Sequence, residues 1–387
     1  MNYIKVIAPA TAEWTRPTEW LAIPSYGENE EVIYLLNAVW DTSVNPCAFQ
    51  LNGTGAGYTV EWGDGTITNH AMNTKAQKNY SYNSLNGTPF RGYRQALIKI
   101  TPQAGSVINW MRFMRHDSYN YSYHSGFLEI VCNLTSQTSL SPFTANSAVI
   151  NSNVESVFYK AHTPNDLQYL FSEFSSLKKV NAFNTSHITT MEYAFSYCGI
   201  SEVPEFDFSN VLNVNSAFFG TFNLLKVKSN DFKKVTNGSS MFRDSYISDL
   251  SNLQFRDVTN LYLFNYAAGK LIRLPDFSLC NSIVGNLDYS FYTLSLDIFP
   301  YINVSGVTTL ANIFYGVQPR VMRRSLLTGA RFSHSYANQL LDATALNEIF
   351  TNLGTASGSQ SITITGNPGA ATCNQSIATA KGWTVIN

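Results

Sequence analysis

Phenylalanines recur at regular distances along the second half of the chain. One series advances by 22 to 27 residues per step, and a second advances by 22 to 25. The first series is Phe171, Phe195, Phe218, Phe242, Phe264, Phe291 and Phe314, and the second is Phe183, Phe208, Phe232, Phe255 and Phe277. A period of about 20 to 29 residues with apolar positions at fixed offsets is typical of a leucine-rich-repeat-like solenoid.

This periodicity predicts a stack of similar units over residues 131–325. Each unit is expected to supply one short strand, such as residues 177–180 (LKKV), and a returning turn. A single unit cannot bury its apolar side, so neighbouring units must stack and place both series of rings in the interior.

The first part of the chain, residues 1–105, has the pattern of β-strands joined by turns. The segments EEVIYLLNAVW, GYTVEW and RQALIKIT alternate between apolar and polar residues or run apolar. The turn between two of these strands consists of Trp62, Gly63, Asp64 and Gly65. Its glycines supply backbone freedom, and the aspartate is expected to accept hydrogen bonds from turn N–H groups.

Two further regions complete the expected organisation. Residues 106–130 are interpreted as a Tyr-rich connector, in which Tyr119, Tyr121 and Tyr123 would share one face of a strand and meet either a partner or the neighbouring domain. Residues 326–387 have a helical pattern that stops at Gly354, followed by a strand, turn, helix and strand. This tail is predicted to be an αβ cap on the open end of the solenoid.

Composition excludes several classes of protein. The net charge is −1 and only 13% of residues are charged, so the basic field that nucleic-acid binding requires is missing. No stretch approaches the ~20 apolar residues of a membrane span. The first residues hold no apolar run long enough for a signal peptide, so we expect synthesis in a cytoplasm. The five cysteines are odd in number and far apart, which implies neither a disulfide framework nor a metal site.

Searches for catalytic or cofactor-binding motifs find none. The GNPGAAT segment lacks the Gly-Lys-Ser/Thr of a phosphate loop, and His116 and His124 have no companions at zinc-ligand spacing. A glycosidase would need two neighbouring carboxylates, for which the scattered candidates are Glu129, Glu155, Asp207 and Asp276. Two of these, Asp207 and Asp276, sit at recurring repeat positions where turn capping is the simpler interpretation. We therefore predict no cofactor, no metal and no enzymatic activity.

One cluster of positive charge interrupts the charge-poor sequence. Arg320, Arg323 and Arg324 lie where the repeat pattern breaks and a helix is expected to begin. The cluster is interpreted either as a solvated helix face or as a docking patch for an acidic partner surface.

The turn region resembles a known domain family. The sequence WGDGT, followed by Asn79-Tyr80 and a late strand, is similar to the signature of PKD domains, with Lys78-Asn79-Tyr80 replacing the family's His-Thr-Tyr. The resemblance implies an immunoglobulin-like β-sandwich over residues 1–105 that acts as a spacer or contact module.

The repeats resemble a second family. Ser240-Met241-Phe242 and Phe208-Ser209-Asn210-Val211 carry a likeness to the BspA-like leucine-rich repeats of bacterial and protist surface proteins and some phage proteins. The family's usual Trp-Asp is replaced here by Phe-Asp or Phe-Asn, and units after residue 280 are irregular. The C-terminal segment SITITGNPGAATCNQSIATAKGWTVIN also resembles the ends of certain phage tail and fibre proteins.

These resemblances favour a mainly β, non-enzymatic phage virion protein: a fibre, spike or decoration protein on the virion surface. Expected partners are other virion proteins, a host-surface glycan or protein, and further copies of the chain in a dimer or trimer. A bacterial cell-surface adhesin is the main alternative, and a polysaccharide-active surface enzyme is the second.

Overall fold

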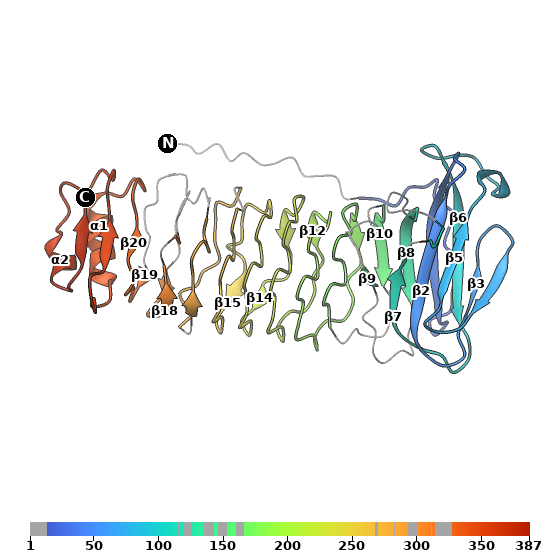
Figure 1. The fold of residues 1–387 in the computed structure, drawn as a ribbon, viewed down its shortest axis with the longest axis horizontal. Helices are drawn as coiled ribbons and strands as arrows, with labels where there is room; N and C mark the ends of the chain where they lie inside the picture. Colours follow the sequence, from blue (N-terminus) through green and yellow to red (C-terminus); the bar gives the residue numbers. More distant parts are fainter. Residues whose placement is uncertain are drawn as a thin grey trace.

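The computed structural model describes residues 14–114, 116–118, 125–134, 143–145, 153–159, 166–267, 270–281, 283–292, 301–310, 312–313 and 327–387. The molecule is elongated (Figure 1). Two β-sheets lie at one end, stacked coils form the middle, and the C-terminal residues lie at the other end. The described residues are mainly β, with few helical turns.

The two sheets at the N-terminal end contain strands from distant parts of the chain. The larger sheet has seven strands in the order β11-β10-β8-β1-β6-β3-β4 and the smaller has four in the order β5-β2-β7-β9. The seven are β11 (Lys179–Val180), β10 (Ser156–Tyr159), β8 (Phe127–Asn133), β1 (Val32–Trp40), β6 (Tyr93–Pro102), β3 (Tyr58–Glu61) and β4 (Ile67–His70). The four are β5 (Lys75–Asn79), β2 (Pro46–Thr54), β7 (Val107–Phe113) and β9 (Phe143–Ala145).

Aromatic side chains join the inner faces of these two sheets. Phe49 of β2 contacts Trp62, which follows β3, with ring centroids 5.7 Å apart. Phe113 of β7 contacts Phe127 of β8 at 5.0 Å. Since each pair links a strand of one sheet to the other sheet, the two sheets share one apolar interior.

The turn at residues 62–66 is held by its own side chains. Gly63 and Gly65 have φ of 79° and 88°, and a Cβ on Gly63 would lie 2.6 Å from the Leu97 carbonyl oxygen. Asp64 Oδ1 accepts hydrogen bonds from the backbone N–H and hydroxyl of Thr66, at 3.1 and 2.7 Å. Lys78 Nζ lies 2.8 Å from Asp64 Oδ2. Burial alone would raise the pKa of Asp64, but the bonds from Lys78 and Thr66 lower it. The carboxylate is therefore engaged in the turn.

The outer face of the seven-stranded sheet is covered by the N-terminal segment, which we define as residues 14–30. This cover explains why β1 reads VIYLLNAVW and is buried on both faces. Trp20 packs with Leu36 and Leu128, and Tyr26 packs with the group around Tyr34. A second apolar layer thus lies outside the sheet.

Segment 106–130, expected to be a connector, supplies strands of both sheets instead. Val107–Phe113 is β7 and pairs with β2, and β8 begins at Phe127 and pairs with β1. Tyr119, Tyr121 and Tyr123, which were expected to share one face of a strand, lie outside the described residues.

The larger sheet continues directly into the first coils. β8 pairs in parallel with β10, and β10 pairs in parallel with β11, which belongs to the repeat region. One continuous cluster of buried apolar side chains accordingly extends from Ile33 in β1 to Trp383 near the C-terminus. The N-terminal sheets therefore cover the first end of the coil stack.

The coils stack through very short parallel strands. The pairs are β12 (Glu202–Val203) with β13 (Lys226–Val227), β14 (Asp231–Phe232) with β15 (Gln254–Phe255), β16 (Val284–Asn286) with β18 (Gly306–Thr309), and β17 (Ile302–Asn303) with β19 (Leu327–Thr328). Parallel pairing of successive coils at a period near 24 residues makes the middle of the molecule a β-solenoid, as the periodicity predicted.

The C-terminal residues form a small parallel sheet with helices. β20 (His334–Ser335), β21 (Ser361–Thr363) and β22 (Thr384–Ile386) pair in that order, with α1 (Ala343–Asn352) and α2 (Ser376–Thr379) between them. Asp342 begins α1 by accepting a hydrogen bond from the Ala345 N–H at 2.8 Å. Among the described residues, no helix has the length and apolar character needed to cross a bilayer.

His334 makes the stability of this C-terminal region depend on pH. The side chain is 4% exposed, and its ring packs against Tyr336 and Trp383 at 5.3 and 5.6 Å. Burial lowers the pKa of His334 to about 4. Below the ordinary pKa of ~6.5, the unfolded chain binds a proton that the folded chain does not.

We therefore expect the C-terminal region to lose stability as pH falls from ~6.5 to about 4, by up to roughly 3 kcal/mol, with no further loss from this group below that range. Hydrogen exchange of α1 at pH 7 and 4.5 measures the change. His334→Phe keeps an aromatic ring and should remove the dependence. An unchanged pH dependence in that variant would contradict the assignment.

Candidate functional site

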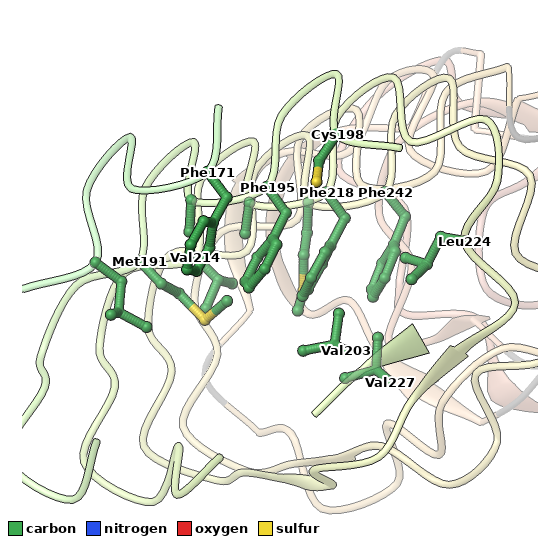
Figure 2. Packing of buried hydrophobic residues seen from close by; sticks show 14 of the residues in the cluster. Phe171, Met191, Phe195, Cys198, Val203, Val214, Phe218, Leu224, Val227 and Phe242 are labelled. Atoms are coloured by element: carbon green, nitrogen blue, oxygen red, sulfur yellow. The ribbon is translucent and has the colours of Figure 1, made fainter. Parts of the chain in front are cut away.

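The interior of the solenoid is a column of phenylalanine rings, one from each coil (Figure 2). Phe171, Phe195, Phe218 and Phe242 are each at most 1% exposed. Successive ring centroids lie 5.2, 5.6 and 5.2 Å apart. Because successive coils are close enough for their rings to touch, these phenylalanines form a continuous aromatic stack along the solenoid axis.

The second phenylalanine series forms a parallel column. Phe208, Phe232, Phe255 and Phe277 follow one another at 5.2, 5.6 and 5.7 Å. Phe183 is only partly buried and reaches this column through Phe206, at 4.8 Å. Phe314, the last member of the first series, lies outside the described residues.

The coils are joined on one side by a hydrogen-bond ladder that runs in a single direction. In this ladder the N–H of each column phenylalanine donates to the carbonyl of the residue just before the next column position. These bonds are Phe171 to Ala194 (2.8 Å), Phe195 to Ala217 (2.8 Å) and Phe218 to Met241 (2.9 Å). The residues two positions before and after each of these phenylalanines have positive φ, as Tyr193 (54°) and Tyr197 (53°) do around Phe195.

Both features place Asn265, and not Phe264, in the phenylalanine column. The Phe242 N–H donates to the Phe264 carbonyl at 2.9 Å, so the next column position is residue 265. The flanking positive-φ residues agree, since they are Leu263 (54°) and Ala267 (58°). Phe264 fills the adjacent interior position and meets Phe242 edge-on at 84°. The 22-residue step to Phe264 in the sequence marks this displacement.

Asn265 is fully buried, and neither atom of its side-chain amide has a hydrogen-bond partner. Asn265→Val should raise the free energy of unfolding by roughly 1–3 kcal/mol, because it removes two buried polar atoms that make no bonds. The matched control is Asn237→Val, which breaks the side-chain bonds described next and should destabilise. Equal destabilisation by both variants in urea denaturation would contradict the assignment.

A second ladder consists of asparagine side chains. Asn237 Nδ2 donates to Asn213 Oδ1 at 3.0 Å, and Asn260 Nδ2 donates to Asn237 Oδ1 at 3.1 Å. Each Oδ1 also accepts from the backbone N–H two residues later, as Asn213 does from Asn215 at 3.0 Å. Each of these asparagines ends a V-x-N pattern that recurs in the sequence, at residues 211–213, 235–237 and 258–260, and this pattern is the sequence signal for the ladder.

One surface of the coils exposes aromatic side chains. We call it the aromatic face, and it comprises Tyr197, Phe219, Phe222, Arg243, Tyr246 and Tyr266. Phe222 is 51% exposed and Tyr197 is 44% exposed. Tyr197 meets Phe219 of the next coil edge-on at 4.9 Å, and Phe222 meets Tyr246 edge-on at 5.4 Å, so rings of successive coils contact each other. The repeat pattern does not by itself indicate this face, although its residues lie one to four positions after a column position.

A cleft of about 730 Å³ lies where the N-terminal segment meets the coils. Its walls include Trp14, Lys178, Lys179, Glu202, Glu205 and Lys228. Lys228 pairs with Glu202 at 2.5 Å, and Trp14 donates its indole N–H to Glu155 at 3.3 Å. Charges of both signs line this cleft, and part of them already pair with each other.

The candidate catalytic groups are used structurally. Asp207 and Asp276 each accept a hydrogen bond from the backbone N–H two residues later, at 2.9 and 2.8 Å. Glu129 pairs with Arg16 at 2.7 Å, and Glu155 pairs with Arg91 at 3.2 Å. These contacts place the four carboxylates in turns and ion pairs.

Burial also makes the thiols poor nucleophiles. It raises the pKa of Cys198 and Cys280 to about 12, and it raises the pKa of Cys47 and Cys132 as well. Within the described residues, no group of three or more metal-ligating side chains is assembled. The expected contact residues Arg320, Arg323 and Arg324 lie outside the part of the chain that the structure describes.

Comparison with known proteins bears on the coils alone. Residues 165–273 match the family model described as "Mycoplasma protein of unknown function, DUF285". The match covers the first part of the region whose sequence resembles the BspA-like repeats, and its described residues belong to the solenoid. No curated protein and no solved structure matches the chain. The match and the stacked coils together establish a repeat protein of the β-solenoid kind.

Proposed function

We propose that the chain is a non-enzymatic structural protein of a phage particle, either a fibre, a spike or a decoration protein. In this proposal the N-terminal sheets are a PKD-like, immunoglobulin-like sandwich that anchors the chain to other virion proteins. The solenoid projects from the anchor, and the C-terminal αβ unit caps its far end. The protein acts on the virion surface, as a dimer or trimer.

The observation that carries the proposal is the elongated body with one unbroken core. A single apolar cluster runs from the N-terminal sheets to Trp383 near the C-terminus, and the backbone forms a long rod (Figure 1). The residues of the aromatic face belong to coils between the N-terminal sheets and the C-terminal region. Many weak contacts on such a face become effective when several copies act together. This build supports attachment to a host-surface glycan or protein.

The structural use of the candidate carboxylates favours this proposal over a polysaccharide-active enzyme. Asp207 and Asp276 cap turns, while Glu129 and Glu155 hold arginines of the N-terminal half. A bacterial adhesin shares the same build and is distinguished only by its location.

The test is to purify phage particles from the source culture on a density gradient and to measure this chain by mass spectrometry. The proposal expects the chain to band with the particles at a fixed copy number. A count in the hundreds indicates decoration of the shell, and a small multiple of three or six indicates a tail fibre. Absence from the particles, with the chain present in the host envelope, would overturn the proposal in favour of the adhesin.

A further inference from the structure

On the aromatic face, the guanidinium group of Arg243 lies between two aromatic rings. The Arg243 guanidinium carbon lies 5.3 Å from the Phe219 ring centroid and 5.1 Å from that of Tyr266. These two rings come from the preceding and the following coil. The guanidinium is therefore held between two aromatic side chains, and its orientation is restricted before any ligand arrives.

Within the described residues, the two terminal nitrogens of this guanidinium have no hydrogen-bond partner. Asp244 forms an ion pair with Arg243, with Oδ2 3.4 Å from Nε, and Nε itself is buried, so a ligand would be bound by the terminal nitrogens. By contrast, Arg256 donates from Nε and Nη2 to both carboxylate oxygens of Asp257, each at 2.8 Å. A planar fork of donors fits a carboxylate with two parallel hydrogen bonds, and Arg243 presents such a fork at a surface where its side chain is 37% exposed.

A second cation lies on the same face. The Lys270 ammonium is 4.2 Å from the Tyr246 ring centroid, and Tyr246 is itself 41% exposed. Arg243 and Lys270 thus each lie against aromatic rings of this face.

The exposed rings are fixed in position. Tyr197 lies across the next coil at Gly220, where an added Cβ would be 2.6 Å from the tyrosine ring carbons. Gly220 also has φ of 64°, a conformation that glycine adopts without strain. Because Gly220 has no side chain, the Tyr197 ring can pack directly against its backbone. Phe219 contacts the same ring edge-on, with an interplanar angle of 66°.

These features suit a chain of sugar rings with carboxylates at intervals. The apolar C–H face of a sugar stacks on an aromatic ring, and rings repeated along the solenoid axis suit a polymer. Arg243 and Lys270, on a chain of net charge −1, are too few cations for the many phosphates of a nucleic acid. A carboxylated polysaccharide can place one carboxylate on the Arg243 fork while its neighbouring sugars contact the exposed rings.

We propose that the aromatic face binds a carboxylate-bearing polysaccharide, with Arg243 pairing with the carboxylate and the exposed rings of Tyr197 and Phe222 stacking on the sugars. This inference rests on the proposed role in surface attachment and names the ligand class for it. The purified chain is sufficient to test it.

The experiment is affinity electrophoresis and calorimetry of the full chain with three carboxylated polymers, namely hyaluronan, alginate and polysialic acid. We expect at least one to bind, and its carboxyl-reduced form to bind roughly tenfold or more weakly. Arg243→Met and Tyr197→Ala should each weaken binding to a similar extent. Arg256→Met removes an exposed arginine whose fork is already filled, and it should leave binding unchanged.

Three results would overturn the inference: binding of none of the three polymers, equal binding of the carboxyl-reduced form, or tighter binding of single-stranded poly(dT). Loss of binding in Arg243→Met counts in favour only if its melting temperature matches that of Arg256→Met. The outcome is independent of the particle experiment. A chain that is absent from virions but binds the acidic polymer would disprove the virion role and leave this site standing.

Discussion

Phe218→Ala is expected to lower the free energy of unfolding of the central coils by roughly 3–5 kcal/mol. Phe218 is fully buried, and its ring stacks on Phe195 and Phe242 at interplanar angles of 16° and 12°. Alanine would remove the ring and leave a cavity between the Phe195 and Phe242 rings. The backbones of these residues are held in place by the hydrogen-bond ladder between coils. The neighbouring coils cannot close that gap without breaking hydrogen bonds.

The matched control is Phe222→Ala, four residues away in the same coil. Phe222 is 51% exposed and touches Tyr246, so its loss should cost less than about 1 kcal/mol. Hydrogen exchange is the appropriate measurement, because stacked coils can open one after another and a single melting temperature hides where they open. Similar loss of protection in both variants would argue against an interior column.

Arg16→Leu is expected to destabilise the N-terminal sheets by roughly 3–5 kcal/mol, because it leaves the buried carboxylate of Glu129 without its partner. Arg16 Nε lies 3.0 and 2.9 Å from the two carboxylate oxygens, and the Glu129 side chain is 5% exposed. Arg16 also donates to the carbonyls of Trp20 and Leu21, at 3.4 and 2.6 Å. One side chain therefore fixes the N-terminal segment to β8, the strand that joins the sheets to the first coil.

Two further variants make this prediction specific. Arg91→Leu removes an arginine whose side chain is 53% exposed and whose pair with Glu155 is at the surface, so it should cost less than about 1 kcal/mol. Arg16→Leu combined with Glu129→Leu should recover most of the loss, since no unpaired charge remains buried. Urea denaturation at neutral pH provides the comparison. If the double variant is no more stable than Arg16→Leu, the buried charge is not the cause.

The sequence alone determined the features that depend on residues close together in the chain. The period near 24 residues predicted stacked coils, since a repeated unit with one apolar side must bury it against its neighbours. The turn at Trp62–Gly63–Asp64–Gly65 was predictable for the same reason. Its glycine conformations and the hydrogen bonds from Thr66 to Asp64 involve only the consecutive residues 62–66. The V-x-N endings likewise pointed to positions that carry the asparagine ladder.

Other features depend on residues that are far apart in the chain, and only the tertiary structure decided them. A one-residue displacement puts Asn265 where spacing suggested Phe264, because hydrogen bonds between coils set the register and no single coil records it. Segment 106–130 became part of the sheets because β7 and β8 found partners in β2 and β1. The guanidinium of Arg243 lies between two aromatic rings because three successive coils bring Phe219, Arg243 and Tyr266 together. Such sites arise where coils meet, so their chemistry depends on stacking that local sequence patterns do not specify.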